Sequence, residues 1–270
     1  ELSSQMRSVL SAELRQVLDG SQFTLMVQPK VSLSSGAVVG GEALIRWLHP
    51  QRGLLSPGAF LGIAQDIGAM VAIDRWVLSQ TLRYCAVLAA RGLPVPISMN
   101  LSVDSLADLE LVDCVRDALV AHRVSPSLLE VEIPEGALMH DVQTSGKVLS
   151  ALHEMGVRVS IDDFGTGYSS FAYLAQFPVD ALKVDRSFVN DLAHSETSRT
   201  IVKSIVRLAH SLSLDVVAEG AELPEQLALL RKMKCDSVQG YVIAKPLPWQ
   251  AFLDFVAGQT THQAPQPTSI

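Results

Sequence analysis

The sequence predicts an α/β protein built as a single (β/α)8 barrel. The chain has 270 residues, a common size for one barrel domain. Short β-branched or apolar runs alternate with longer helix-like segments along it, which is the pattern of a sheet wound with helices. No linker, charge block or short repeat divides the chain. A doubly wound open sheet is the alternative that the same alternation allows.

One helix is expected first, followed by eight strands. Residues 5–19 alternate polar and apolar side chains at helical spacing and stop at Gly20. The runs Phe23–Val31 and Val38–Trp47 are typical of a hairpin joined at Ser34–Gly36, so the start of the barrel is expected to be irregular. The other strand runs are Ile97–Leu101, Leu128–Ile133, Val157–Ile161, Ala181–Val184, Asp215–Ala218 and Ser237–Val242.

Helix-like segments lie between most of these runs. Apolar residues recur near a spacing of about 3.6 residues in Asp74–Arg91. The other such segments are Leu111–His122, Asp141–Met155, Ser198–Ser211 and Pro224–Met233. From Gly258 the chain is polar, contains proline and has no periodicity. Residues 1–257 are therefore predicted to be one domain and residues 258–270 a disordered tail.

Composition excludes several classes of protein. Hydrophobic residues make up 48% and charged residues 18%, which suits a large core and excludes disordered and fibrous chains. The net charge is −7 and the pI about 5.5, which argues against binding a nucleic-acid polymer through its phosphates. If the protein binds a phosphate compound, something other than net charge must hold it.

The cysteines and the chain ends bear on location. Cys85, Cys114 and Cys235 lie far apart without a CxxC pair, which argues against a disulfide scaffold or a zinc site and favours a reducing, cytoplasmic compartment. No apolar stretch approaches the roughly 18 residues of a membrane span, and no signal-peptide pattern opens the chain. Because the chain lacks an initiator Met, we expect a piece of a longer protein, in which any sensor or inner-membrane tether lies outside this chain.

Polar residues stand at or near the ends of seven predicted strands. Strand C-termini meet at one mouth of a barrel, so these side chains are expected to share one cavity. They are Glu42, Asn100, Glu132, the pair Asp162–Asp163, Lys183, Glu219 and Gln239. Singly, each has a structural explanation: an acid can form a turn or cap a helix, Asn100 can cap the next turn, and Lys183 can pair with Asp185. These separate explanations would require seven strand ends to carry polar residues by chance, so a shared site explains the set better.

The charges of this set predict two divalent cations. Five carboxylates and one lysine carry a formal charge of −4, and like charges about 4 Å apart repel by roughly 4 kcal/mol at an effective dielectric of 20. Two divalent ions would cancel the charge, with one Asp of the pair bridging them. Carboxylate and amide oxygens select Mg²⁺ or Mn²⁺. Two such metals commonly drive attack of water on a phosphodiester. The glycines of DFGTGYSS resemble a phosphate loop only weakly; a mobile loop is the alternative.

A series of sequence blocks resembles one family. Glu42-Ala43-Leu44 in GGEALIRWLHP is similar to the signature of EAL domains, which are bacterial cyclic-di-GMP phosphodiesterases. Other blocks resemble the family in the same order, between about residues 7 and 255: QPKV, SPGAF, MNLS, LEVEIPE, IDDFGTGYSS, ALKVDRSF, VVAEGAE, CDSVQGY and AKPL.

The resemblance implies a TIM-like barrel with an irregular, antiparallel first strand. It also implies hydrolysis of cyclic-di-GMP to linear pGpG, by water activated at two Mg²⁺ or Mn²⁺ ions, in bacterial second-messenger signalling. Asp162 and Asp163 match the ligands of the second metal, with Glu219 ordering that metal and its water. Lys183 matches a lysine that contacts the attacking water or its metal-bound neighbour. The residues that match the ligands of the first metal are Glu42, Asn100, Glu132 and Asp162.

Calcium is expected to occupy this site and inhibit, because its oxygen coordination is longer and more flexible.

Other positions match residues that hold the substrate. Arg46 suits a phosphate, because its planar fork can donate two bonds. Glu222 suits a guanine edge, because a carboxylate accepts from N1–H and the 2-amino group. The full set implied is Gln28, Leu44, Arg46, Asp185, Glu222 and Gln239.

Glu135 matches an acid that tethers the DFGTGYSS loop and, through it, the loop used in family dimers. Pro134 stands where the family usually has Thr and removes a backbone donor, which leaves this coupling open. Ala221 replaces the more usual Val.

The expected partners are cyclic-di-GMP, a second copy of the chain, and a GGDEF (diguanylate cyclase) or sensor domain elsewhere in the full-length protein. No nucleic-acid polymer is expected. Two alternatives stay open: a cyclic-di-GMP receptor or interaction module with weak turnover, and a different two-metal barrel enzyme acting on another phosphodiester. The intact set of acids favours the phosphodiesterase.

Overall fold

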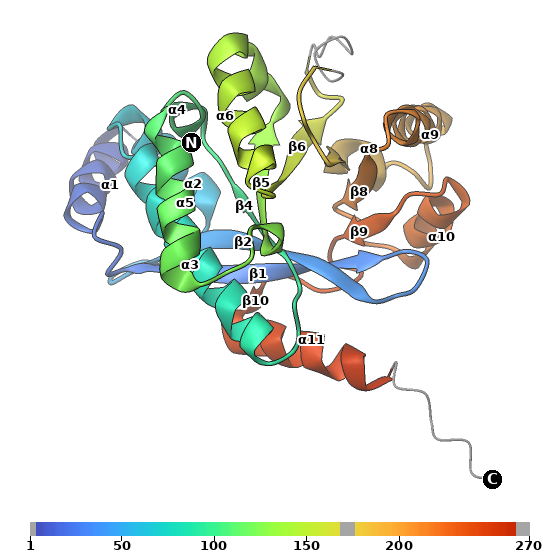
Figure 1. The fold of residues 1–270 in the computed structure, drawn as a ribbon, viewed down its shortest axis with the longest axis horizontal. Helices are drawn as coiled ribbons and strands as arrows, with labels where there is room; N and C mark the ends of the chain where they lie inside the picture. The colour runs from blue at the N-terminus through green and yellow to red at the C-terminus, as the bar shows by residue number, and fades with distance from the viewer. Residues whose placement is uncertain (1–3, 168–175, 263–270) are drawn as a thin grey trace.

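The computed structural model describes residues 4–167 and 176–262, and in these residues ten strands form one sheet, eight of which close into a barrel. Figure 1 shows the helices arranged around the strands. The predicted (β/α)8 barrel is confirmed, and so is its antiparallel first strand. The barrel strands are β1 (Phe23–Ser32), β2 (Val38–His49), β4 (Ile97–Asn100), β5 (Leu129–Pro134), β6 (Arg158–Phe164), β7 (Ala181–Val184), β8 (Asp215–Glu219) and β9 (Ser237–Gln239).

Strand β1 closes the barrel. Strands β2, β4, β5, β6, β7, β8 and β9 are parallel neighbours in that order. Strand β1 lies between the two ends of this series and is antiparallel to both β2 and β9. Two short strands extend the sheet at its margins: β3 (Gly53–Leu55) pairs with β2, and β10 (Leu247–Pro248) pairs with β1.

The hairpin of β1 and β2 sets the register of the first two strands. Gly36, in the connecting turn, has a φ of 74°, a left-handed conformation that glycine adopts without steric cost. The resulting register places Gln28 opposite Glu42 and Lys30 opposite Gly40. Gln28 and Lys30 therefore point to the same side of β1, two residues apart.

Helices cover the outside of the barrel, and the apolar core lies between the two layers. Helix α3, for example, buries Ile73, Val77, Leu82 and Leu88. The helices are α1 (Ser4–Gln16), α2 (Pro57–Asp66), α3 (Met70–Ala90), α4 (Val103–Leu106), α5 (Glu110–His122), α6 (Val142–Glu154), α8 (Arg186–Asn190), α9 (Glu196–Ser211), α10 (Pro224–Lys232), α11 (Trp249–His262) and the 3-10 turns η1 (Pro126–Leu128) and η2 (Glu135–Met139).

The barrel interior differs from this outer layer, because polar side chains fill it. Strand β5 is buried on both faces, with Leu129 and Val131 alternating with Glu130 and Glu132. Both glutamates contact the buried ammonium of Lys30 on β1. The strands thus send apolar residues toward the helices and charged residues inward.

The C-terminal boundary differs from the sequence prediction. Helix α11 continues to His262, so Gly258 lies inside a helix rather than at the start of a disordered tail. Phe252, Leu253 and Val256 are buried and fix this helix on the barrel, so the chain after them extends it despite its polar composition. Residues 263–270 lie outside the described residues. No helix in the described ranges has the length and apolar character needed to cross a bilayer.

Candidate active site

Lys183, on β7, lies at the centre of the polar side chains at the C-terminal ends of the strands. Its ammonium donates to Glu132 and lies 2.6 Å from Glu219 Oε1, 3.0 Å from Asp162 Oδ1 and 3.9 Å from Glu42 Oε2. The four acids come from β5, β8, β6 and β2. The structure therefore gathers the strand-end residues that the sequence pattern selected, and Lys183 pairs with them.

Lys183 is a buried cation. Burial alone lowers the pKa of Lys183, but the surrounding carboxylates, led by Glu132 and Glu219, outweigh it and hold the pKa well above its ordinary value. A lysine in this state donates hydrogen bonds and attracts negative charge, but it does not accept a proton.

A hydrogen-bond network orients Glu42. Asn100 on β4 donates from Nδ2 to Glu42 Oε1 at 2.7 Å. Gln239 on β9 donates from Nε2 to Glu42 Oε2 at 2.5 Å and to Gln28 Oε1 on β1 at 3.0 Å. The use of its amide nitrogen leaves Asn100 an amide oxygen that can bind a cation. With these residues, each of the eight barrel strands contributes one side chain to the cluster.

The turn after β4 is held from outside the barrel. Asp74, buried on α3, accepts from the Ser102 N–H at 2.9 Å and from Ser105 Oγ at 2.7 Å. Ser102 caps α4, so the residue that caps this turn is Ser102 and not Asn100. Asp74 thereby fixes the backbone directly after Asn100.

The pair Asp162–Asp163 lies near the C-terminal end of β6, where the register with β7 shifts between Ile161 and Phe164. Asp163 has a φ of 54°, and its N–H donates to Asp162 Oδ1 at 2.9 Å. Oxygens of Asp162, Asp163 and Glu219 lie within 4.8 Å of one another. This backbone conformation brings both aspartates into one cluster. A turn that only reversed the chain would not need the two carboxylates to lie together.

The carboxylates of this cluster are short of positive charge. Burial, reinforced by the charge of Asp162 against the opposing Lys183, raises the pKa of Glu219 to about 8. Burial and then the charge of Glu132 raise the pKa of Glu42, and burial and then Asp162 raise that of Asp163. Mutual repulsion of this kind is relieved by a bound cation. The donors are carboxylate and amide oxygens, so the residues present fit hard divalent ions such as Mg²⁺ or Mn²⁺.

A polar cavity of about 310 Å³ opens beside the cluster. The cavity is lined by four of the six predicted substrate residues, Gln28, Leu44, Glu222 and Gln239, together with the cluster acids Glu42, Asp162 and Glu219. Arg46 and Asp185 are not among the residues that line the cavity: Arg46 donates from Nη1 to its neighbour's carbonyl at 2.9 Å, and Asp185 caps α8 through the Ser187 N–H. Both nevertheless interact with the cluster, Arg46 with the charge of Glu42 and Asp185 with that of Asp163.

Comparison with known proteins places the chain in a family. The model of the EAL domain matches residues 11–246. This chain belongs to the EAL domain family. It is 44% identical over 246 residues to the bifunctional diguanylate cyclase/cyclic di-GMP phosphodiesterase MucR of Pseudomonas aeruginosa, covering 91% of this chain and 36% of MucR. It is 42% identical over 262 residues to the cyclic di-GMP phosphodiesterase NbdA of the same organism, covering 97% of this chain and 34% of NbdA.

A solved structure agrees with this assignment. The PaMucR phosphodiesterase in complex with c-di-GMP matches this EAL domain with a TM-score of 0.87 and 43% identity, over 90% of this chain and 99% of that chain. The chain spans about a third of the length of MucR and NbdA.

Glu135 contacts the segment to which the family resemblance assigned it. Buried at the start of η2, Glu135 accepts from the Gly165 N–H at 2.8 Å through Oε2. Gly167 also lies against it, because a Cβ at Gly167 would come within 2.8 Å of Glu135 Oε1. Pro134 has a φ of −55° and caps η2, a geometry that proline favours, so it does not prevent this contact. Residues 168–170 of the DFGTGYSS block lie outside the described residues.

Besides two glycines, three residues of the EAL domain line the cavity without having been selected from the sequence: Tyr241, Arg186 and Asn190. Tyr241 is 56% exposed, and Lys245 Nζ lies 5.3 Å from its ring centroid. Arg186 and Asn190 belong to α8. Their positions in the sequence could have identified them, because residues just after a barrel strand lie at the mouth of the barrel. Tyr241 follows β9 by two residues, and α8 begins shortly after the end of β7.

Proposed function

We propose that this EAL domain hydrolyses one phosphodiester bond of cyclic-di-GMP and releases linear pGpG. The observation that carries the proposal is the convergence of four strand-end acids on Lys183 beside a polar cavity. The named activities of MucR and NbdA, and the c-di-GMP complex of PaMucR, support the choice of substrate.

Two Mg²⁺ or Mn²⁺ ions are proposed to act at this site. Asp162 and Asp163 would hold the second ion, with Glu219 beside them. The residues proposed to hold the first ion are Glu42, Asn100, Glu132 and Asp162. When bound, the ions supply an acidified water and positive charge for the phosphate.

The chain's own groups orient the reactants. Lys183, as a fixed cation, attracts the developing negative charge and orients the water without taking its proton. Gln239 and Asn100 hold the Glu42 carboxylate in one rotamer, which keeps it from collapsing onto Lys183. Catalytic roles are thus proposed for Lys183, Glu219 and Glu42.

The cavity residues are proposed to hold the dinucleotide. Leu44 would pack against it, and Gln28, Gln239 and Asp185 would provide polar contacts. Glu222 would accept from a guanine edge. Arg46, half-buried near the mouth, would turn its guanidinium to a phosphate oxygen.

A chromatographic hydrolysis assay tests the proposal. The purified domain should convert cyclic-di-GMP to pGpG with Mg²⁺ or Mn²⁺, lose this activity with a chelator, and be inhibited by Ca²⁺. The control is Glu42→Ala, which removes one proposed ligand and leaves the fold. Product no higher than in this control would refute hydrolysis, and tight binding without product would indicate a receptor.

We also propose two larger assemblies: a further domain in the full-length protein and a homodimer. The bifunctional name of MucR supports a GGDEF or sensor domain elsewhere in the full-length protein. A homodimer is proposed from the family resemblance, with the contact of Glu135 to the Gly165 backbone as its link to this loop. Sedimentation of wild type and Glu135→Gln with and without nucleotide tests that coupling.

A further inference from the structure

Lys30, on β1, is a buried cation that the site described above does not use. Its side chain is 5% exposed, and its Nζ lies 2.6 Å from Glu132 Oε1 and 3.1 Å from Glu130 Oε1. Glu132 has no exposed side-chain surface, and its other oxygen, Oε2, accepts from Lys183. Each oxygen of this one carboxylate therefore carries its own ammonium.

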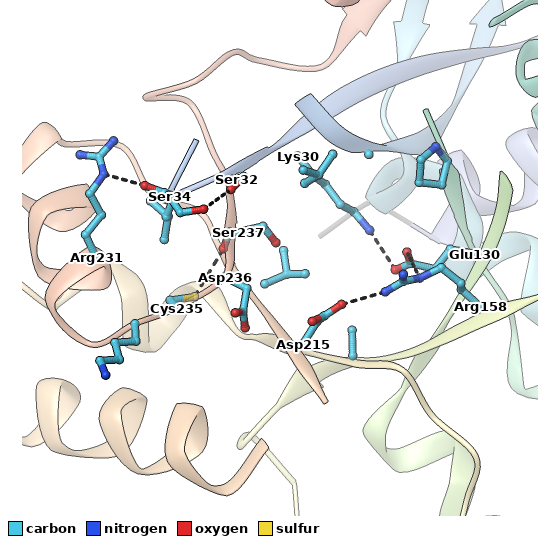
Figure 2. Close-up of a pocket in the computed structure, with 17 residues that line it drawn as sticks. Lys30, Ser32, Ser34, Glu130, Arg158, Asp215, Arg231, Cys235, Asp236 and Ser237 are labelled. Carbon is cyan, nitrogen blue, oxygen red and sulfur yellow. Dashed lines mark hydrogen bonds and ion pairs between the residues drawn. The ribbon is translucent and has the colours of Figure 1, made fainter. Parts of the chain in front are cut away.

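Lys30 reaches Glu132 from the end of the barrel opposite the cluster. Gln28 lines the cavity beside Glu42, and Lys30 lies two residues further along β1, opposite Gly40. Figure 2 shows Lys30 beside Glu130 in a pocket of about 690 Å³ that also contains Arg158 and Asp215. Lys183 and Lys30 thus hold Glu132 from opposite sides.

A chain of contacts fixes Lys30 in turn. Glu130 also accepts from Ser160 Oγ at 2.8 Å. Arg158 Nε lies 3.9 Å from the second oxygen of Glu130, and Figure 2 shows the two side chains next to each other. Arg158 is itself paired with Asp215 at 3.0 Å. Because Lys30 is paired with two buried carboxylates, its ammonium has little freedom to move away from Glu132 Oε1.

We propose that Lys30, by holding Glu132 Oε1, leaves at most one oxygen of this carboxylate for a metal ion, namely Oε2, which Lys183 also contacts, and thereby favours Mg²⁺ and Mn²⁺ over Ca²⁺. The inference rests on the proposed two-metal function. Mg²⁺ requires an octahedron of six ligands, which carboxylates that each give one oxygen can supply. Ca²⁺ takes six to eight oxygens and commonly binds a carboxylate through both. Binding of a metal through both Glu132 oxygens would require the Lys30 ammonium to give up its shorter ion pair and keep only Glu130 as a partner, and losing such a contact inside the barrel is costly.

Lys30 is accordingly a positioning residue that acts through Glu132. A purely structural role, in which the ion pairs only stabilise the barrel, predicts lower stability with an unchanged order of metal preference. Metal preference, measured by binding rather than turnover, separates the two roles.

The test compares Lys30→Met and the double variant Lys30→Met/Glu130→Gln with wild type. The double variant removes both charges and folds even if the single change leaves Glu130 too poorly paired. Free Mn²⁺ is measured by electron paramagnetic resonance, and Mg²⁺ and Ca²⁺ by competition, without substrate. The ratio of Ca²⁺ to Mn²⁺ affinity should rise by about tenfold in the double variant, the scale of effects from residues that orient metal ligands.

Glu130→Gln alone is the matched control, because it leaves the contact of Lys30 with Glu132 in place, and its ratio should match wild type. A folded double variant with the wild-type ratio overturns the inference while leaving the proposed function standing. A wild-type domain that binds no Mn²⁺ overturns the proposed function, and this inference with it.

Discussion

Lys183 Nζ lies 2.6 Å from Glu219 Oε1, although both side chains are largely or wholly buried and the cation already contacts acids from three other strands. One ammonium therefore serves several carboxylates at once. This one cation does not neutralise the acids around it, because the pKa of Glu219 remains raised, to about 8, even beside Lys183.

Replacing Lys183 with Met should reduce both activity and metal-free stability. Loss of one positioned charge typically lowers kcat by about 10²- to 10³-fold. Removing one partner of a buried ion pair costs about 3–5 kcal/mol, because the remaining charges are left unpaired. Mn²⁺ should restore part of that stability by neutralising the same acids. Urea unfolding with chelator and with Mn²⁺ checks this, and an equal loss in both conditions would contradict it.

The metal-free domain should lose stability as pH rises from about 5 to about 8. The pKa of Glu219 is raised from 4.5 to about 8, so in this range the folded state retains a proton that the unfolded chain releases. The pKa values of Glu42 and Asp163 are raised too and act in the same direction. The pKa of Glu132 is lowered to about 2, so its stabilising contribution is constant across this range.

Urea unfolding in chelator at several pH values measures this dependence. Glu219→Gln is the control, because it cannot titrate and should flatten the fall. Mg²⁺ should reduce the fall as well, since a metal binds the ionised acids and its affinity rises with pH. A Glu219→Gln profile with the wild-type slope would show that another group is responsible.

Asp163→Asn should lower turnover about a hundredfold or more while nucleotide binding persists. Asn lacks the charge that would hold the second ion, yet it tolerates the left-handed φ of 54° at this position. The variant therefore tests the charge without disturbing the turn. Turnover and equilibrium binding of cyclic-di-GMP should separate; a rate near wild type would exclude Asp163 as a metal ligand.

The strands that carry the cluster could be predicted from local pattern. An apolar, β-branched run with a polar residue at or near its end indicates a barrel strand that ends at the barrel mouth. The strand Ala181–Val184, for example, was predicted with the bounds observed. The convergence of these ends then follows from barrel geometry.

Lys30 could not be predicted in this way. Lys30 is the single charged residue of β1, so no local pattern marks it. Its partners Glu130 and Glu132 lie 100 and 102 residues further along the chain. Only closure of the barrel by β1 brings them together. The short helix α8 was missed for a different reason: five residues carry too little periodicity, and its cap Asp185 was interpreted as a substrate contact or a partner of Lys183.

Tyr241→Ala should weaken the binding of cyclic-di-GMP more than it slows the chemical step. The exposed ring lines the cavity near Glu222, where a guanine base can stack on it. Stacking of a base on an aromatic side chain contributes about 1–3 kcal/mol, equivalent to a rise in KM of roughly 5- to 150-fold. Tyr241→Phe retains the aromatic face and should retain near wild-type KM. Steady-state kinetics of the two variants decides the point, because a phenylalanine variant as impaired as the alanine variant would assign the role to the hydroxyl group and not to the ring.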